Sequence, residues 1–237
     1  MAIKCIGCNQ KALILAAIAG LSVTPLMAYP AVASTILLQA DFNDLETPTT
    51  SNPRTRFSTI EGAGISLGDS GFTILSGSVN ALDETFELFP NQPIAPGQGK
   101  IVDVAGEPPE GGAIQSDTFA FSEGEIFELQ FKLFAWQDSF FGEEASLRVT
   151  FGDLFDETVT LRFDDAPQML TRTFEANTNG EAAVIFDPRN LGNPRVDVAP
   201  FIDDVTLRVA SVPEPFTVSN WALLSWLGLL SWKRRKK

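Results

Sequence analysis

The sequence contains no histidine, and its two cysteines both lie within the first eight residues. The absence of histidine excludes Ser-His-Asp catalysis, histidine-ligated zinc and the usual general base at neutral pH. Cys5 and Cys8 form a CxxC motif. Because this motif falls in a predicted signal peptide, we expect the exported protein to have no disulfide and no thiol chemistry. Little remains for catalysis except carboxylates.

The N-terminus has the three parts of a secretory signal peptide. Lys4 and Lys11 are positive, residues 12–23 are apolar, and Ala31-Val32-Ala33 forms a small-x-small cleavage site. We therefore predict that residues 1–33 are a signal helix removed by signal peptidase, with Ser34 as the new N-terminus. Cleavage after Ala28 is the alternative.

The C-terminus, residues 212–237, also has three parts. Val212, Pro213, Glu214 and Pro215 form a stiff extended segment, because proline fixes φ and disfavours helix in the residue before it. Residues 216–232 are apolar and uncharged, and as a helix they would span about 25 Å, near the lower limit for crossing a bilayer. The chain ends on five cations, which favour the cytoplasmic side: Lys233, Arg234, Arg235, Lys236 and Lys237.

This order of motif, apolar span and basic end resembles the PEP-CTERM sorting signal of Gram-negative bacteria and cyanobacteria. The resemblance implies processing by an exosortase-like enzyme, transient anchoring in the inner membrane with the domain outside the cytoplasm, and final delivery to the cell surface or extracellular matrix. The alternative is a simple single-pass anchor in which Pro-Glu-Pro is only a linker.

Between these ends, residues 34–211 have the pattern of an all-β domain. Residues 34–215 hold all 30 acidic residues and 10 of the 17 basic ones, a net charge of −20 that disfavours binding to nucleic acid. Phe127, Leu129, Phe131 and Leu133 alternate with polar residues, the period of a half-buried strand. Similar short segments recur about every ten residues. We therefore predict two antiparallel sheets packed face to face in a jelly-roll sandwich.

The order of segments also resembles galactose-binding-like jelly-roll domains. The matching stretches are Leu37-Leu38, Phe42-Asn43 and residues 72–79, 100–104, 124–131 and 201–207. Asn43, Phe72 and Asp204 depart from residues common in that family. The resemblance implies that a structural calcium ion can tie the first strand to the last, with oxygens from Asp41, Asn43, Asp44, Asp203 and Asp204. The alternative is that Asp203 and Asp204 cap a strand or bind an arginine.

Two further groups of residues suggest contacts with carbohydrate. Trp136, Gln137, Asp138 and Phe140 form an aromatic and polar cluster at a strand end, which suits glycan contact but suits core packing equally well. A glycosidase needs two carboxylates, and adjacent acids occur at Glu143/Glu144, Asp156/Glu157 and Asp164/Asp165.

The leading hypothesis is thus an exported, non-catalytic surface or matrix protein associated with exopolysaccharide. A carbohydrate-binding module with a defined glycan is the alternative, and a carboxylate-only glycosidase is a weaker one.

Overall fold

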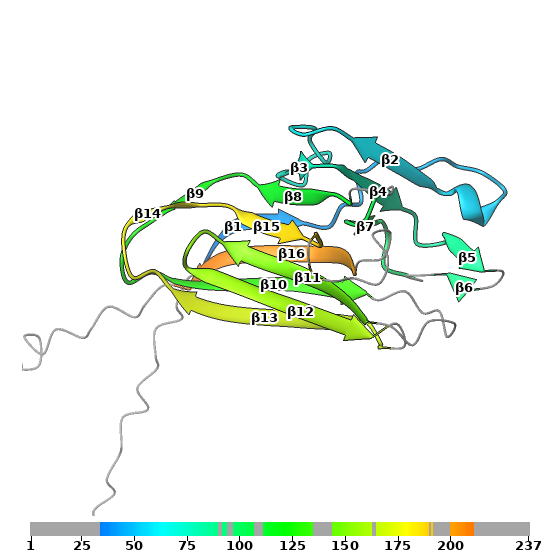
Figure 1. Ribbon diagram of the computed structural model, residues 1–237. Coiled ribbons are helices and arrows are strands. Elements are labelled where there is room, and N and C mark those ends of the chain that lie inside the picture. Colours follow the sequence, from blue (N-terminus) through cyan, green and yellow to red (C-terminus); the bar gives the residue numbers. More distant parts are fainter. Residues whose placement is uncertain are drawn as a thin grey trace, which may run out of the picture. The chain divides into compact units, whose positions relative to one another are not determined.

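The computed structural model describes the domain between the two predicted targeting segments (Figure 1). The described residues are 34–89, 92–93, 97–106, 111–134, 144–162, 165–189, 191 and 200–210. The predicted signal peptide and sorting tail lie outside them. Within the described ranges the only helix is a single 3-10 turn, Pro53–Thr55, and none is long and apolar enough to cross a membrane. The all-β prediction is confirmed.

Most of the strands belong to two antiparallel sheets. Sheet A has seven strands in the order β13-β10-β16-β7-β4-β2, with β1 also pairing with β16. Its strands are β1 (Thr35–Ala40), β2 (Phe57–Glu61), β4 (Ser78–Leu82), β7 (Ile101–Asp103), β10 (Ile126–Phe134), β13 (Gln168–Glu175) and β16 (Phe201–Ala210).

Sheet B has five strands in the order β12-β11-β15-β8-β3. They are β3 (Phe72–Ser76), β8 (Ala113–Ser116), β11 (Glu144–Phe151), β12 (Phe155–Arg162) and β15 (Val184–Asp187). Two small pairs complete the described part: β9 (Phe119–Phe121) with β14 (Gly180–Ala182), and β5 (Glu87–Phe89) with β6 (Gln92–Pro93).

Phenylalanine side chains join the inner faces of the two sheets. Phe127 of β10 lies 5.3 Å from Phe151 of β11, and Phe131 lies 5.4 Å from Phe186 of β15, measured between ring centroids. All four rings are fully buried. Burial of one such side chain contributes roughly 1.5–3 kcal/mol, so these rings account for much of the stability of the sandwich. The β10 alternation is confirmed, since its four predicted core residues are all buried.

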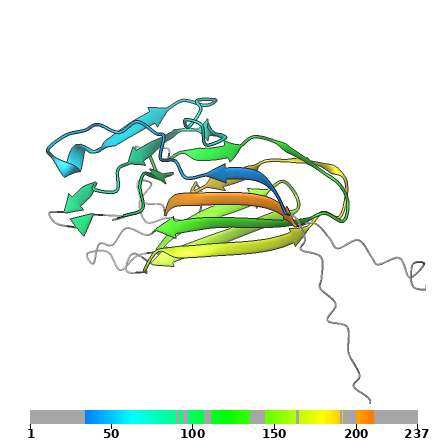
Figure 2. The ribbon, with the colours of Figure 1, turned by 180° about the vertical axis from the view of Figure 1, so that it is seen from behind.

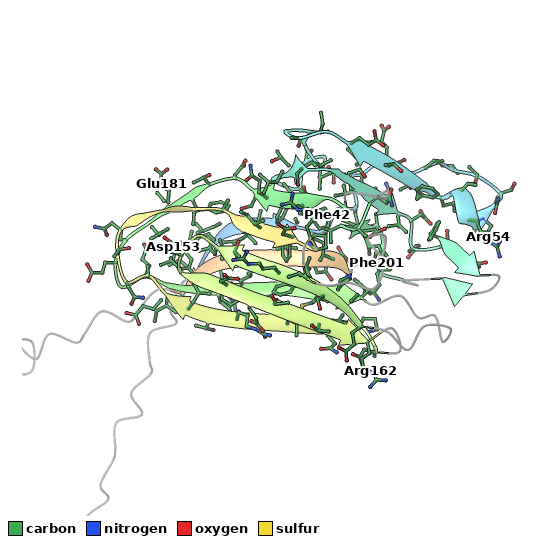
Figure 3. The ribbon with its side chains drawn as sticks, in the orientation of Figure 1. Phe42, Arg54, Asp153, Arg162, Glu181 and Phe201 are labelled. Atoms are coloured by element: carbon green, nitrogen blue, oxygen red, sulfur yellow. The ribbon has the colours of Figure 1, made fainter. Side chains whose placement is uncertain are left out.

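The two ends of the sandwich differ (Figures 1 and 2). Thr35 pairs with Val209 and Ile126 with Ala210, so the described chain begins and finishes at one end of sheet A. Figure 3 places Asp153 and Glu181 at that end, and Arg162 and Phe201 at the other. A second apolar cluster lies towards the Phe201 end, on the outer face of sheet A: Phe57, Leu82, Phe86, Ile101, Phe134 and Phe201.

A tight contact next to β4 requires glycine. Gly106 has a φ of +58°, and a Cβ added there would lie 2.0 Å from the Ser78 carbonyl oxygen. Gly112 approaches the same oxygen to the same distance. Gly106 and Gly112 therefore both lie directly against the start of β4, which an L side chain at either position would prevent.

Candidate functional site

The outer face of sheet A carries a mixed set of charged and uncharged polar side chains. The pairing of the strands arranges these side chains in rows across the sheet, because residues opposite each other on neighbouring strands point to the same face. Gln130 of β10 pairs with Thr171 of β13 on one side and Thr206 of β16 on the other, and Thr206 pairs with Gln39 of β1. Four strands thus present one continuous line of side chains.

We call Thr171, Gln130, Thr206 and Gln39 the amide–hydroxyl row. Thr171 and Gln39 are exposed, and Gln130 and Thr206 are half-buried. The Gln130 amide donates a hydrogen bond of 3.3 Å to the Thr171 hydroxyl. Each of the four side chains can both donate and accept hydrogen bonds, and none carries a charge.

The rows on either side of the amide–hydroxyl row are charged but paired. On one side Arg208 donates to Glu128 across β16 and β10. On the other, the Lys132 ammonium lies 3.4 Å from the Asp204 carboxylate, donates to Gln98 and sits 5.4 Å from the centre of the Phe134 ring. These four charges form two ion pairs, so this part of the face is close to neutral. Among the described residues, three large apolar side chains are exposed, and two of them, Ile36 and Met169, lie at opposite corners of this part of the face.

Asp203 is a buried acid where β16 bends. The register of β16 against β10 shifts at this point, and Asp204 has a φ of +49°. Asp203 is 1% exposed, and no hydrogen-bond donor within the described residues reaches its Oδ1 atom. Burial, together with the negative charges of Asp204 and Asp41, raises the pKa of Asp203 to about 7, although Lys132 and the Asp204 backbone N–H oppose this shift.

The five predicted calcium ligands do not converge. Asn43 Oδ1 accepts the backbone N–H of Lys100 at 3.0 Å, and Asp44 accepts that of Asp69, so both side chains hold distant loops to the end of β1. Asp41 and Asp204 remain near Asp203. Across the described ranges, no three acidic residues come close enough together to hold a metal ion. The orphaned Asp203 oxygen fits a cation, but backbone carbonyls would have to supply other ligands.

The Asp156/Glu157 pair does not form an acid–base site. The two side chains project from opposite faces of β12. Asp156 accepts from Arg148 at 2.6 Å on the outer face of sheet B, whereas Glu157 accepts from Arg172 of β13 at 2.7 Å between the sheets. The hydrogen bond from each arginine lowers the pKa of its carboxyl partner. Both groups therefore stay ionised at neutral pH, and neither serves as a general acid.

Several predicted residues fall outside the described ranges. They include the predicted glycan-contact residues Trp136, Gln137, Asp138 and Phe140, together with Glu143 and Asp164. The cleavage site at Ala31, Ala33 and Ser34 touches the described part only at its last residue. Sequence reasoning also missed the amide–hydroxyl row, because it depends on the pairing of β1 with β16, which no local pattern specifies.

No protein-family model matches the chain, and no curated protein does. Three solved structures with partial similarity are an arabinose-bound α-L-arabinofuranosidase, a family 35 carbohydrate-binding module of Clostridium thermocellum and the CBM22-1 xylan-binding domain of Paenibacillus barcinonensis. Their identities are 8%, 12% and 11%, and their TM-scores 0.41, 0.33 and 0.32.

The coverage of these matches is uneven. The arabinofuranosidase match covers 75% of this chain and 27% of the enzyme, so the chain spans about a quarter of its length. The family 35 match covers 48% of this chain and 79% of the module, and the CBM22-1 match covers 77% and 99%. Overlaps this distant carry no argument about ligand or activity.

Proposed function

We propose that this chain is an exported, non-catalytic protein whose β-sandwich binds carbohydrate. The observation that carries the proposal is the outer face of sheet A, where the amide–hydroxyl row lies between two ion pairs. Sugars present hydroxyl groups that donate and accept, and side chains of the Gln and Thr type match them in both roles. The row offers groups that can form hydrogen bonds to a sugar, but it has no catalytic nucleophile and no carboxyl group with a shifted pKa.

The residue chemistry of the described part supports the non-catalytic half of this proposal. The chain has no histidine, and Asp156 and Glu157 are each held by an arginine. Asp203 has a raised pKa, but it is only 1% exposed and so is not accessible to a bound sugar. A glycosidase would need a second carboxylate at a fixed separation across a bound sugar.

The surroundings of the domain are part of the same proposal. Signal peptidase would release residues 1–33, and an exosortase-like enzyme would act at Val212–Pro215. The final location is then the cell surface or extracellular matrix, where exopolysaccharide is the available partner. The strong acidity of the domain suits this setting and opposes association with nucleic acid.

A glycan array tests the proposal. Full-length protein, purified in a zwitterionic detergent without a sugar headgroup, is applied to immobilised glycans, and in parallel to a panel of soluble polysaccharides monitored for reducing ends. We expect binding to at least one glycan and no release of reducing ends. Hydrolysis would favour the glycosidase alternative. Folded protein that binds no glycan would leave a purely structural surface component and end the proposal.

A further inference from the structure

We propose that the ligand is an uncharged, extended polysaccharide that crosses the strands of sheet A along the amide–hydroxyl row. This inference rests on the proposed function and deepens it. It names both the class of glycan and its direction on the face, neither of which follows from a sandwich fold.

The charges on this face select against an ionic polymer. Glu128 is paired with Arg208, and Lys132 with Asp204, so the cations here are already neutralised. The whole chain carries a net charge of −13. A polyanion would find no free cation on the row and would be repelled by the rest of the domain. An uncharged chain of hydroxyl groups meets no such penalty, and the row offers it uncharged partners of matching chemistry.

The direction follows from how the side chains change along and across the strands. Along β10, the outward residues run from Lys132 through Gln130 to Glu128, so a chain parallel to the strand would pass from one ion pair to the other. Across the strands, Thr171, Gln130, Thr206 and Gln39 keep one uncharged chemistry. Adjacent strands are about 4.8 Å apart, so this row spans roughly 14 Å, which is longer than a single pyranose ring. An extended segment of several sugars fits this length.

Affinity electrophoresis through gels containing a polysaccharide tests the inference. The probes are galactomannan and hydroxyethyl cellulose as uncharged polymers, and alginate as a polyanion. The test variant combines Gln130→Met with Thr206→Val, which keep side-chain size and suit a strand but remove the hydrogen-bonding groups. The control is Thr158→Val, an exposed threonine of β12 on the outer face of sheet B.

We expect an uncharged polymer to retard the native protein and alginate not to do so. The double variant should bind about tenfold more weakly, as expected for the loss of two hydrogen-bonding side chains, while the Thr158→Val control binds like the native protein. Circular dichroism confirms that each variant is folded, and Gln39→Ala at the exposed end of the row serves if the double variant is not.

The other outcomes separate this inference from the proposed function. Retardation by an uncharged polymer that the row variants leave unchanged would overturn the row and keep carbohydrate binding. Retardation by alginate alone would overturn the uncharged class. If the protein bound no glycan, either on these gels or on the array, both this inference and the proposed function would be overturned.

Discussion

At the scale of single residues, Asp203 is a carboxyl group whose burial disfavours its charged form. An aspartate normally has a pKa near 3.8, and burial raises that of Asp203 to about 7. A carboxyl whose folded pKa exceeds its unfolded pKa holds its proton more tightly in the folded state. Its effect on stability is therefore neutral at low pH and becomes unfavourable as the pH rises from about 4 to about 7.

Replacing Asp203 by asparagine should remove this penalty. We expect Asp203→Asn to be more stable than the native protein by about 2–4 kcal/mol at about pH 8, with little difference at about pH 4. Urea unfolding at both pH values measures this, and Asp153→Asn, which changes an exposed acid at the opposite end of the sandwich, is the control. An equal difference at both pH values would mean that Asp203 does not titrate between them.

A bound calcium ion would also offset the unfavourable burial of the Asp203 charge. If the ion binds the ionised Asp203 with help from Asp41 or Asp204, it stabilises the folded state alone and raises the melting temperature. We expect millimolar calcium at about pH 8 to raise the melting temperature of the native protein, relative to chelator, and to leave Asp203→Asn unchanged. Equal midpoints for the native protein with calcium and with chelator would remove calcium from the description of this domain.

At the scale of elements, the margin formed by β12 and β13 is closed by an ion pair between the sheets. Glu157 and Arg172 project inward and lie 2.7 Å apart, with side chains about one-third exposed. Phe155 of β12 stacks on Phe174 of β13 beside them, with ring centroids 5.2 Å apart. Inward-pointing charges at a sheet margin also oppose association through the free edges.

Replacing one partner of this ion pair should lower the free energy of unfolding more than replacing both partners. Arg172→Leu leaves Glu157 half-buried without its partner, and we expect a loss of about 1–3 kcal/mol, partly regained in the Arg172→Leu/Glu157→Leu double variant. Because the hydrogen bond from Arg172 lowers the pKa of Glu157, the contribution of the pair is present above about pH 4.5 and is lost as the pH falls. Urea unfolding of the native protein, of Arg172→Leu and Glu157→Leu alone and of the double variant measures the coupling, and strictly additive effects would rule it out.

Some features of these strands could be predicted from the sequence, and others could not. Alternation alone predicted β10, whose apolar residues face the core. The inward Glu157 and Arg172 share the parity of Phe155 and Phe174, so two opposite charges on the apolar faces of consecutive strands were a readable signal of an inter-sheet pair. The amide–hydroxyl row was not readable, because Gln39 and Thr206 meet only through pairing of the first and last strands. Likewise, no local pattern indicated that Asn43 and Asp44 hold other loops.

At the scale of the whole molecule, the position of the described chain ends bears on export. Thr35 and Val209 pair at the end of the sandwich that carries Asp153 and Glu181, and Phe201 lies at the opposite end. The predicted tail begins at Val212, two residues after Ala210. If the tail tethers the domain as predicted, the tether starts at the end of sheet A where Thr35 and Val209 pair, and not at the Phe201 end. If the domain binds a polymer as proposed, we therefore expect it to do so both before and after release.

Release itself is the last prediction, and the mass of the C-terminus measures it. The stiff Val212–Pro215 segment separates the sandwich from the apolar run, so a membrane enzyme can reach it without unfolding a strand. We expect protein recovered from the cell surface or medium to end near Pro215, and the Pro213→Ala/Pro215→Ala variant to stay in the membrane with all five terminal cations. An intact C-terminus on surface protein with the native motif would instead identify the tail as a permanent anchor, and would leave carbohydrate binding by the sandwich untouched.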